Sequence, residues 1–399
     1  MNLKKIICTV SSLTFMSSAF AISSLSVSIS TDGKYTVADD RDDNVYLYNL
    51  NNKNISKVNN EKVNHFSPNF IDGTDNFIYQ DINNKVYVVN ADTKKVIKSF
   101  AVPQIKPKGF EHQQNIYFQA LNKDMNIYVY VTQLGINIAK VADGKLEDIY
   151  SYNKKFMGTR FVPKIYDNKV IATTDLGDLL IFDLDKVFKD DKYEPIKIRR
   201  NYGSTMNTIS PDGKYIYTAD NSRTGGAYNL QKNKSKSDDS GIYYTAHIPN
   251  VTYLEGDPNQ SDIMGDLANF KFIDNDKIIA TFKGKNQPYL WAFFYTPSEF
   301  DWSGKGKYKR PMFYSDKYAP LTKDPLKFVT GDYRNNTDPY PVNYGYNTVF
   351  DTSIKSHTLV IGRANDRGIM VYNYNPSDES LKLDWVAEPP KQESKGWFW

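Results

Sequence analysis

Short segments in which apolar and polar residues alternate recur along almost the whole chain. Four of them follow one another near the beginning, at Leu25–Ile29, Tyr35–Asp39, Val45–Leu50 and Ile55–Val58. Alternation with a period of two is typical of β-strands that bury one face, and polar turn residues separate these segments. No segment shows a long 3.6-residue periodicity, so the pattern predicts an all-β protein with little helix.

The alternating segments belong to a long internal repeat. The tetrapeptide Asp-Gly-Lys-Tyr occurs at Asp32–Tyr35 and again at Asp212–Tyr215. The two copies are 180 residues apart, which is four units of 45 residues. Repeats of about 40–50 residues with several short strands each are typical of β-propeller blades. One such sheet cannot bury both of its faces, so the repeat predicts a closed ring of stacked sheets.

One strand in each unit combines apolar and aromatic residues, and in most units it ends in Asn or Asp. These marker strands are Val45–Asn49, Val86–Asn90, Ile127–Val131, Leu179–Asp183, Ala227–Asn229, Tyr289–Phe293 and Ile369–Asn373. They predict a single propeller of about seven four-stranded blades over residues 22–388. The aromatic-rich stretch 300–346 departs from the repeat. We interpret it as an irregular insertion between the last two blades, and a degenerate eighth blade is the alternative.

Two runs resemble a known type of repeat. Lys85–Ile97 (KVYVVNADTKKVI) and Ser210–Ala219 (SPDGKYIYTA) are similar to the YVTN-type, WD-like repeats of secreted bacterial β-propellers. The resemblance covers most of the chain as a repeat pattern, although the third, sixth and seventh units diverge. The Gly-His and Trp-Asp signatures of true WD repeats are missing. The resemblance implies a propeller fold and leaves the function open, because propellers carry many unrelated activities.

Residues 1–21 have the features of a secretory signal peptide. Lys4 and Lys5 precede the mostly apolar stretch Ile6–Met16, and Ala19–Ala21 supplies the small residues that signal peptidase requires. The apolar stretch is too short to cross the ~30 Å hydrocarbon core of a bilayer comfortably. We therefore expect cleavage after Ala21, a mature chain without a transmembrane segment, and a periplasmic or secreted protein. An uncleaved membrane anchor is the alternative.

Composition narrows the chemistry that the mature chain can perform. The one cysteine, Cys8, lies within the signal and lacks the small residues that precede a lipoprotein cysteine, so the mature chain has no thiol for disulfides or nucleophilic catalysis. The formal net charge is +4, and two of these charges are the signal lysines. A nearly neutral mature chain does not favour nucleic-acid binding. Thirty Tyr and 22 Phe fit many half-exposed strands.

Catalytic and metal-binding motifs are not evident. The four histidines are scattered at His65, His112, His247 and His357, without the close spacing of metal ligands. No nucleophile elbow, phosphate-binding loop or dinucleotide fingerprint occurs. We assign no catalytic, cofactor or metal residues, and no cofactor. The alternative is an enzyme with its site in the central tunnel, either a lactonase-like hydrolase, for which Asp39, Asp220 and Asp351 are candidates, or a quinone-dependent redox enzyme.

Aromatic residues outside the repeat are the candidate interaction residues. Loop-borne Tyr offers a large contact area at low entropic cost, and aromatic residues at a free chain end are costly to expose. The candidates are Tyr333, Tyr340, Tyr344 and Tyr346 in the stretch 300–346, and Trp397, Phe398 and Trp399 in the tail 389–399. The sequence therefore favours an exported, monomeric, non-catalytic scaffold that binds a protein or a cell-envelope glycan through one face.

Overall fold

The computed structural model describes residues 26–40, 43–64, 68–103, 116–132, 135–152, 162–174, 178–190, 192–198, 205–220, 224–230, 246–247, 264–274, 277–284, 289–295, 318–320, 350–362, 368–378 and 380–390. Within these ranges the chain forms 28 strands and one short helix.

The first three blades contain β1 (Val27–Ile29), β2 (Tyr35–Asp39), β3 (Val45–Asn49) and β4 (Asn54–Lys57); β5 (Asn69–Phe70), β6 (Asn76–Gln80), β7 (Lys85–Asn90) and β8 (Lys95–Ala101); and β9 (Ile116–Leu121), β10 (Ile127–Thr132), β11 (Gly135–Ala142) and β12 (Lys145–Tyr152). The fourth and fifth contain β13 (Lys164–Tyr166), β14 (Lys169–Thr173), β15 (Leu179–Asp183), helix α1 (Leu184–Val187) and β16 (Ile196–Ile198); and β17 (Thr205–Ile209), β18 (Tyr215–Asp220), β19 (Thr224–Asn229) and β20 (Ala246–His247). The last two contain β21 (Met264–Phe272), β22 (Lys277–Gly284), β23 (Tyr289–Tyr295) and β24 (Tyr318–Pro320); and β25 (Phe350–Ser353), β26 (Thr358–Gly362), β27 (Ile369–Asn375) and β28 (Ser380–Ala387).

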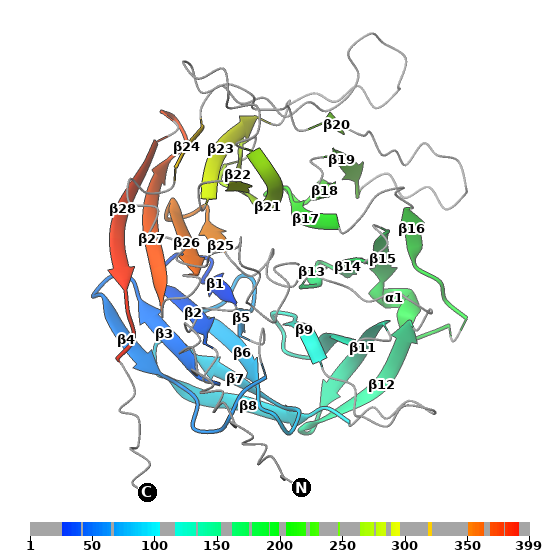
Figure 1. The fold of residues 1–399 in the computed structure, drawn as a ribbon. Coiled ribbons are helices and arrows are strands. Elements are labelled where there is room, and N and C mark those ends of the chain that lie inside the picture. The colour runs from blue at the N-terminus through cyan, green and yellow to red at the C-terminus, as the bar shows by residue number, and fades with distance from the viewer. Residues whose placement is uncertain are drawn as a thin grey trace, which may run out of the picture.

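These strands form five sheets of four strands and one sheet of eight. The eight-stranded sheet is two antiparallel meanders, β5–β8 and β9–β12, joined where Lys145 of β12 pairs in parallel with Ala101 of β8. The described residues thus form seven blades around a central axis, with β1, β5, β9, β13, β17, β21 and β25 innermost (Figure 1). The prediction of an all-β propeller of about seven four-stranded blades is confirmed.

The repeated tetrapeptide forms the turn between the first two strands of blades one and five. Asp32 Oδ1 accepts hydrogen bonds from Ser30 Oγ (2.8 Å) and Lys34 N (3.0 Å). The second copy repeats this geometry, since Asp212 Oδ1 accepts from Ser210 Oγ (2.7 Å) and Lys214 N (3.0 Å). The repeat is therefore conserved within the chain because both turns need the same side-chain acceptor.

Glycine is required at the next position of both turns. Gly33 and Gly213 have positive φ values of 73° and 68°. A Cβ atom on Gly33 would lie 1.7 Å from Ser356 Oγ, and one on Gly213 would lie 1.7 Å from Tyr166 Oη. Both contacted residues belong to the preceding blade in the ring. The glycine thus lets the turn adopt a left-handed conformation and approach the neighbouring blade closely.

The hydrophobic core lies between the blades. Val37, Val45 and Leu47 of blade one pack against Phe77 and Val89 of blade two. Comparable clusters lie between blades two and three, three and four, four and five, and seven and one. Because these sheets have a neighbouring sheet on each side, strands such as β3 are buried on both faces.

The ring closes between blades one and seven without any exchange of strands, since each blade is one continuous stretch of chain. Trp385 of β28 makes an edge-to-face contact with Tyr48 of β3, with ring centroids 6.3 Å apart. Lys53 pairs with Asp384, and Ser353 Oγ donates to Thr31 O (2.8 Å). Figure 1 shows the first blade (blue) beside the last (orange to red). In the part of the chain that the structure describes, these contacts across the seam all involve a side chain.

Two details differ from the sequence interpretation. Six of the marker strands are the third strands of their blades, whereas Ile127–Val131 lies in β10, the second strand of blade three. Residues 318–320, within the stretch 300–346, form β24, which pairs with β23 as the fourth strand of blade six. The rest of that stretch lies outside the described residues. Among the helices described, none is long and apolar enough to span a membrane.

Candidate functional site

The interaction residues expected from the sequence all lie outside the described residues. These are Tyr333, Tyr340, Tyr344, Tyr346, Trp397, Phe398 and Trp399. Their role therefore stays a prediction. The described residues offer two other sites: a group of charged side chains near the axis, and a polar groove between the first two blades.

Four charged residues, here called the axial cluster, come together near the centre of the ring. Lys164, Lys271 and Asp351 lie on the innermost strands β13, β21 and β25, and Asp72 lies in the turn after β5. Lys271 Nζ is 3.3 Å from Asp351 Oδ1, and these side chains are only 15% and 20% exposed. Asp351 Oδ2 also accepts from the backbone N–H of Ile29 (3.1 Å). Asp351 thus connects blades six, seven and one.

The electrostatics of the axial cluster are balanced. Burial lowers the pKa of Lys271 below its usual value, although the charge of Asp351 opposes this effect. Burial would also lower the pKa of Lys164, but the carboxylates of Asp72 and Asp351 raise it above the usual value. Two ammonium groups therefore lie near two carboxylates, of which Asp72 is exposed to solvent, and the attraction offsets part of the cost of burying the lysines.

The carboxylates that the sequence offered as catalytic candidates have structural partners. Asp39 Oδ1 accepts from Ser26 N (2.6 Å) and Ser26 Oγ (2.8 Å), which ties β2 to the residue before β1. Asp351 is engaged by Lys271 and Ile29 as described above. Asp220 ends β18, and its side chain is outside the described part of the structure. No group of three or more His, Cys, Asp or Glu residues arranged to hold a metal ion occurs among the described residues.

One end of the ring carries the short turn between the first and second strands of every blade. The connection between the third and fourth strands lies at the same end, because alternate turns of an antiparallel meander do, and it is longer in blades four to six. We call this end the turn face. Gly73 N of blade two donates to Thr31 Oγ1 of blade one (2.9 Å). Lys98 Nζ of blade two donates to Met125 O of blade three (2.6 Å), and Tyr374 Oη of blade seven donates to Ile273 O of blade six (3.2 Å). These bonds tie the turn face together between blades one and two, two and three, and six and seven.

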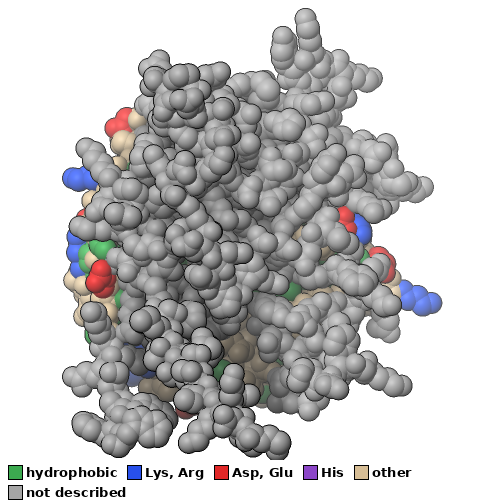
Figure 2. All heavy atoms as spheres, viewed as in Figure 1, with side chains coloured by type: hydrophobic (Ala, Val, Ile, Leu, Met, Phe, Trp, Pro, Cys, Tyr) green, Lys and Arg blue, Asp and Glu red, His purple; other side chains and the backbone are tan. Residues whose placement is uncertain are grey.

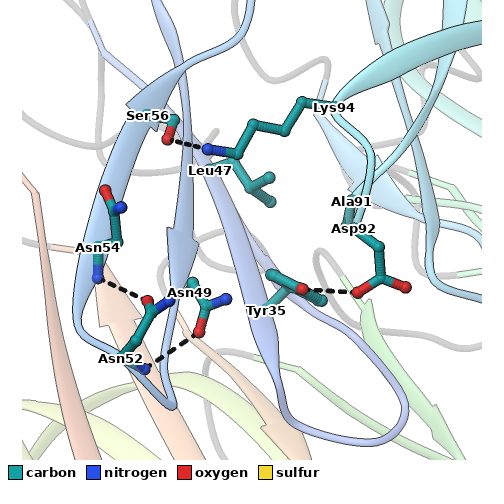
Figure 3. A pocket seen from close by; sticks show the side chains of 9 residues that line it. All are labelled: Tyr35, Leu47, Asn49, Asn52, Asn54, Ser56, Ala91, Asp92 and Lys94. Carbon is teal, nitrogen blue, oxygen red and sulfur yellow. Dashed lines mark hydrogen bonds between the residues drawn. The ribbon is translucent and has the colours of Figure 1, made fainter.

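A groove opens at the rim of the turn face between blades one and two (Figure 3). It encloses roughly 220 Å³ and is lined by Tyr35, Leu47, Asn49, Asn52, Asn54, Ser56, Ala91, Asp92 and Lys94. Blade one contributes the outer strand β4 and the turn before it, and blade two contributes the turn between β7 and β8. We call this feature the blade 1–2 groove.

Two hydrogen bonds cross the blade 1–2 groove. Tyr35 Oη donates to Asp92 Oδ1 (2.6 Å), and Lys94 Nζ donates to Ser56 Oγ (2.7 Å). The bond to Asp92, together with burial, raises the pKa of Tyr35 to about 12, so this hydroxyl remains protonated at neutral pH. In Figure 3 the Lys94–Ser56 bond and the Tyr35–Asp92 bond lie at separate places around the groove, with the three Asn side chains along blade one. The groove is therefore preformed, and its walls are fixed to each other.

The sequence analysis did not predict the groove, although the Asn-rich turn that forms its blade-one side can be recognised in the sequence. The segment Asn49–Asn54 contains four Asn and was interpreted only as a turn. The corresponding turn of the next repeat supplies Asp92 and Lys94, one blade period further along the chain. Aligning equivalent turns of successive repeats would have placed these residues side by side.

Figure 2 shows described side chains of both charge signs at the edges of the molecule in that view, consistent with the nearly neutral composition.

Comparisons with known proteins support the fold. No protein-family model matches the sequence, and no curated protein matches it. Among solved structures, Hsv2 from Kluyveromyces lactis superposes with a TM-score of 0.55 at 10% identity, covering 92% of this chain and 100% of that one. The β-propeller domain of Cps50 (Swd1) from Myceliophteria thermophila gives 0.56 at 11%, covering 88% and 96%. A chain of the mitotic checkpoint complex gives 0.55 at 10%, covering 91% and 86%. At such low identity the likeness concerns the fold alone, and that fold is a WD-like β-propeller.

Proposed function

We propose that the protein is an exported, non-catalytic β-propeller that acts as a binding scaffold, with the turn face as its recognition surface. The observation that carries this proposal is a set of hydrogen bonds from one blade to the first turn of a neighbouring blade, which ties blade one to two, two to three, and six to seven. A surface that is already ordered loses little conformational entropy when a partner binds. Loops held on a rigid framework are also where binding residues concentrate in proteins.

Two further observations support this function over an enzyme. The carboxylates Asp39 and Asp351, which a tunnel enzyme would need, are used to connect strands and blades. One of the similar propellers was solved as part of a multiprotein assembly, the mitotic checkpoint complex. Export rests on the signal-like residues 1–21, and it places the partner in the cell envelope or outside the cell.

Photo-crosslinking in cells tests the recognition surface. A benzophenone amino acid replaces Thr93, which lies in the exposed turn between β7 and β8 on the turn face. The control replaces Ile97, which is 49% exposed on β8 of the same blade but lies on the outer strand. We expect an adduct of higher mass from position 93 and none from position 97, measured by immunoblotting after irradiation. An adduct only at position 97, or at neither position, would contradict the proposal.

A further inference from the structure

The blade 1–2 groove carries one negative and one positive side chain, each hydrogen-bonded to a neutral hydroxyl group. Asp92 accepts from Tyr35 Oη, and Lys94 donates to Ser56 Oγ. One carboxylate and one ammonium leave the groove without net charge. A strongly anionic or cationic ligand would therefore find one repulsive group for each attractive one. The electrostatics favour an uncharged ligand.

The remaining hydrogen-bonding groups of the groove are amides. Asn49 Oδ1 accepts from the backbone N–H groups of Asn51 and Asn52, and Asn52 Oδ1 accepts from Asn54 N. Within the described part of the chain, the side-chain NH2 groups of Asn49, Asn52 and Asn54 make no hydrogen bond. The side-chain oxygen of Asn54 is likewise unbonded there. Donors and an acceptor thus line one wall, and hydroxyl groups match both because each can donate and accept.

The lining and the size of the groove restrict the ligand further. Leu47 and Ala91 border the groove but are only 2% and 0% exposed, so its accessible lining is mainly polar and suits a hydroxyl-rich ligand. The volume of roughly 220 Å³ is below the ~300 Å³ at which pockets begin to hold drug-sized molecules, so it suits a single ring. Asn52, Asn54, Asp92 and Lys94 are exposed, so the groove is open to solvent and a chain can continue beyond it.

We propose that the blade 1–2 groove binds one neutral sugar unit of a glycan. The ring hydroxyls bond to the amides of Asn49, Asn52 and Asn54 and to the carboxylate of Asp92. This proposal rests on the proposed function, because it names the class of partner that one part of the turn face recognises.

Isothermal titration calorimetry with the purified mature chain tests this site. The probes are the methyl glycosides of glucose, galactose, mannose and N-acetylglucosamine, and tetramers of the same sugars. We expect binding of at least one probe, with the tetramer at least as tight as the monomer if the unit belongs to a longer chain. Replacing Asn54 by Ala removes one donor and one acceptor, so the affinity should fall about three- to tenfold.

The matched control is Asn51→Ala, because Asn51 is exposed in the same turn but does not line the groove. We expect this variant to bind like the wild type, and both variants to unfold at the wild-type temperature. The proposal is overturned if no probe binds, if Asn54→Ala binds normally, or if Asn51→Ala loses affinity equally. If no sugar binds but crosslinking at position 93 gives a protease-sensitive adduct, the sugar site is wrong, whereas the proposed binding scaffold is supported with a protein as its partner.

Discussion

At the scale of single residues, the repeated Asp-Gly-Lys turn shows why a short motif can be recognised from sequence alone. Its aspartate accepts two local hydrogen bonds and its glycine contacts the preceding blade, so both residue types are required wherever this turn occurs. Burial would raise the pKa of Asp32, but hydrogen bonds from Lys34 and Ser30 outweigh it and hold the pKa below its usual 3.8. The charged form of Asp32 thus stabilises the folded state.

The substitution Asp32→Asn tests this contribution. It keeps an acceptor but removes the charge and the ion pair with Lys34, so we expect the free energy of unfolding at pH 7 to fall by about 1 kcal/mol. Because the folded-state pKa is depressed, the wild type loses this stabilisation as the pH falls through that pKa, below 3.8. Urea unfolding at pH 7 and pH 3 should therefore show the difference between variant and wild type shrinking in acid.

The second copy of the turn provides the control for this prediction. Asp212 makes the same bonds, but its side chain is 45% exposed, compared with 18% for Asp32. Solvent screens the exposed pair more strongly, so Asp212→Asn should cost less than Asp32→Asn. A larger cost for Asp212→Asn, or a difference for Asp32→Asn that grows in acid, would show that the charge does not stabilise the turn.

At the scale of strands and blades, the first blade could be predicted almost residue by residue. The segments expected at Tyr35–Asp39 and Val45–Leu50 are β2 and the β3 region, because alternation and turn residues are local signals. The order of the strands in blade three was harder to predict. Both β10 and β11 are rich in apolar residues and are almost completely buried, so the marker pattern alone does not distinguish the second strand from the third. Burial on both faces removes the alternation that identifies a strand's position.

The seam between blades one and seven yields a prediction at this scale. Trp385 is partly buried against the cluster between these blades and contacts Tyr48. Trp385→Ala should lower the free energy of unfolding by about 2–3 kcal/mol, because it removes apolar contact and an aromatic pair where no strand crosses the seam. Urea unfolding measures the loss. The neighbouring Val386 is 41% exposed, and Val386→Ala should cost about 0.5 kcal/mol or less. Equal losses would mean that Trp385 does not hold the seam.

At the scale of the whole molecule, the ring could be predicted from the period of the repeat, but the site could not. The Asn-rich turn before β4 is visible in the sequence, whereas its closeness to Asp92 and Lys94 depends on how blade two packs against blade one. That packing depends on Tyr35, Leu47 and other buried residues, and the positions of their side chains cannot be derived from the sequence. The interaction residues in the stretch 300–346 and at Trp397–Trp399 stay predictions.

Export is the remaining prediction for the whole chain. If residues 1–21 are a cleaved signal, N-terminal sequencing of the protein recovered outside the cytoplasm should begin at Ile22. A bulky charged residue in place of Ala21 should block processing, because signal peptidase accepts only small residues there. Exported wild-type protein that begins at Met1 would argue for an uncleaved anchor instead.

The seam has a consequence for the ancestry and engineering of the chain. Each blade is one unbroken stretch of sequence, so no sheet depends on a strand borrowed from the other end of the chain. A circularly permuted gene that started at a different blade would therefore encode the same sheets in the same order around the ring. Tolerance to such rearrangement is expected where the new ends fall between structural units. The order of the blades, rather than the blade at which the chain starts, therefore determines how the sheets are arranged in the ring.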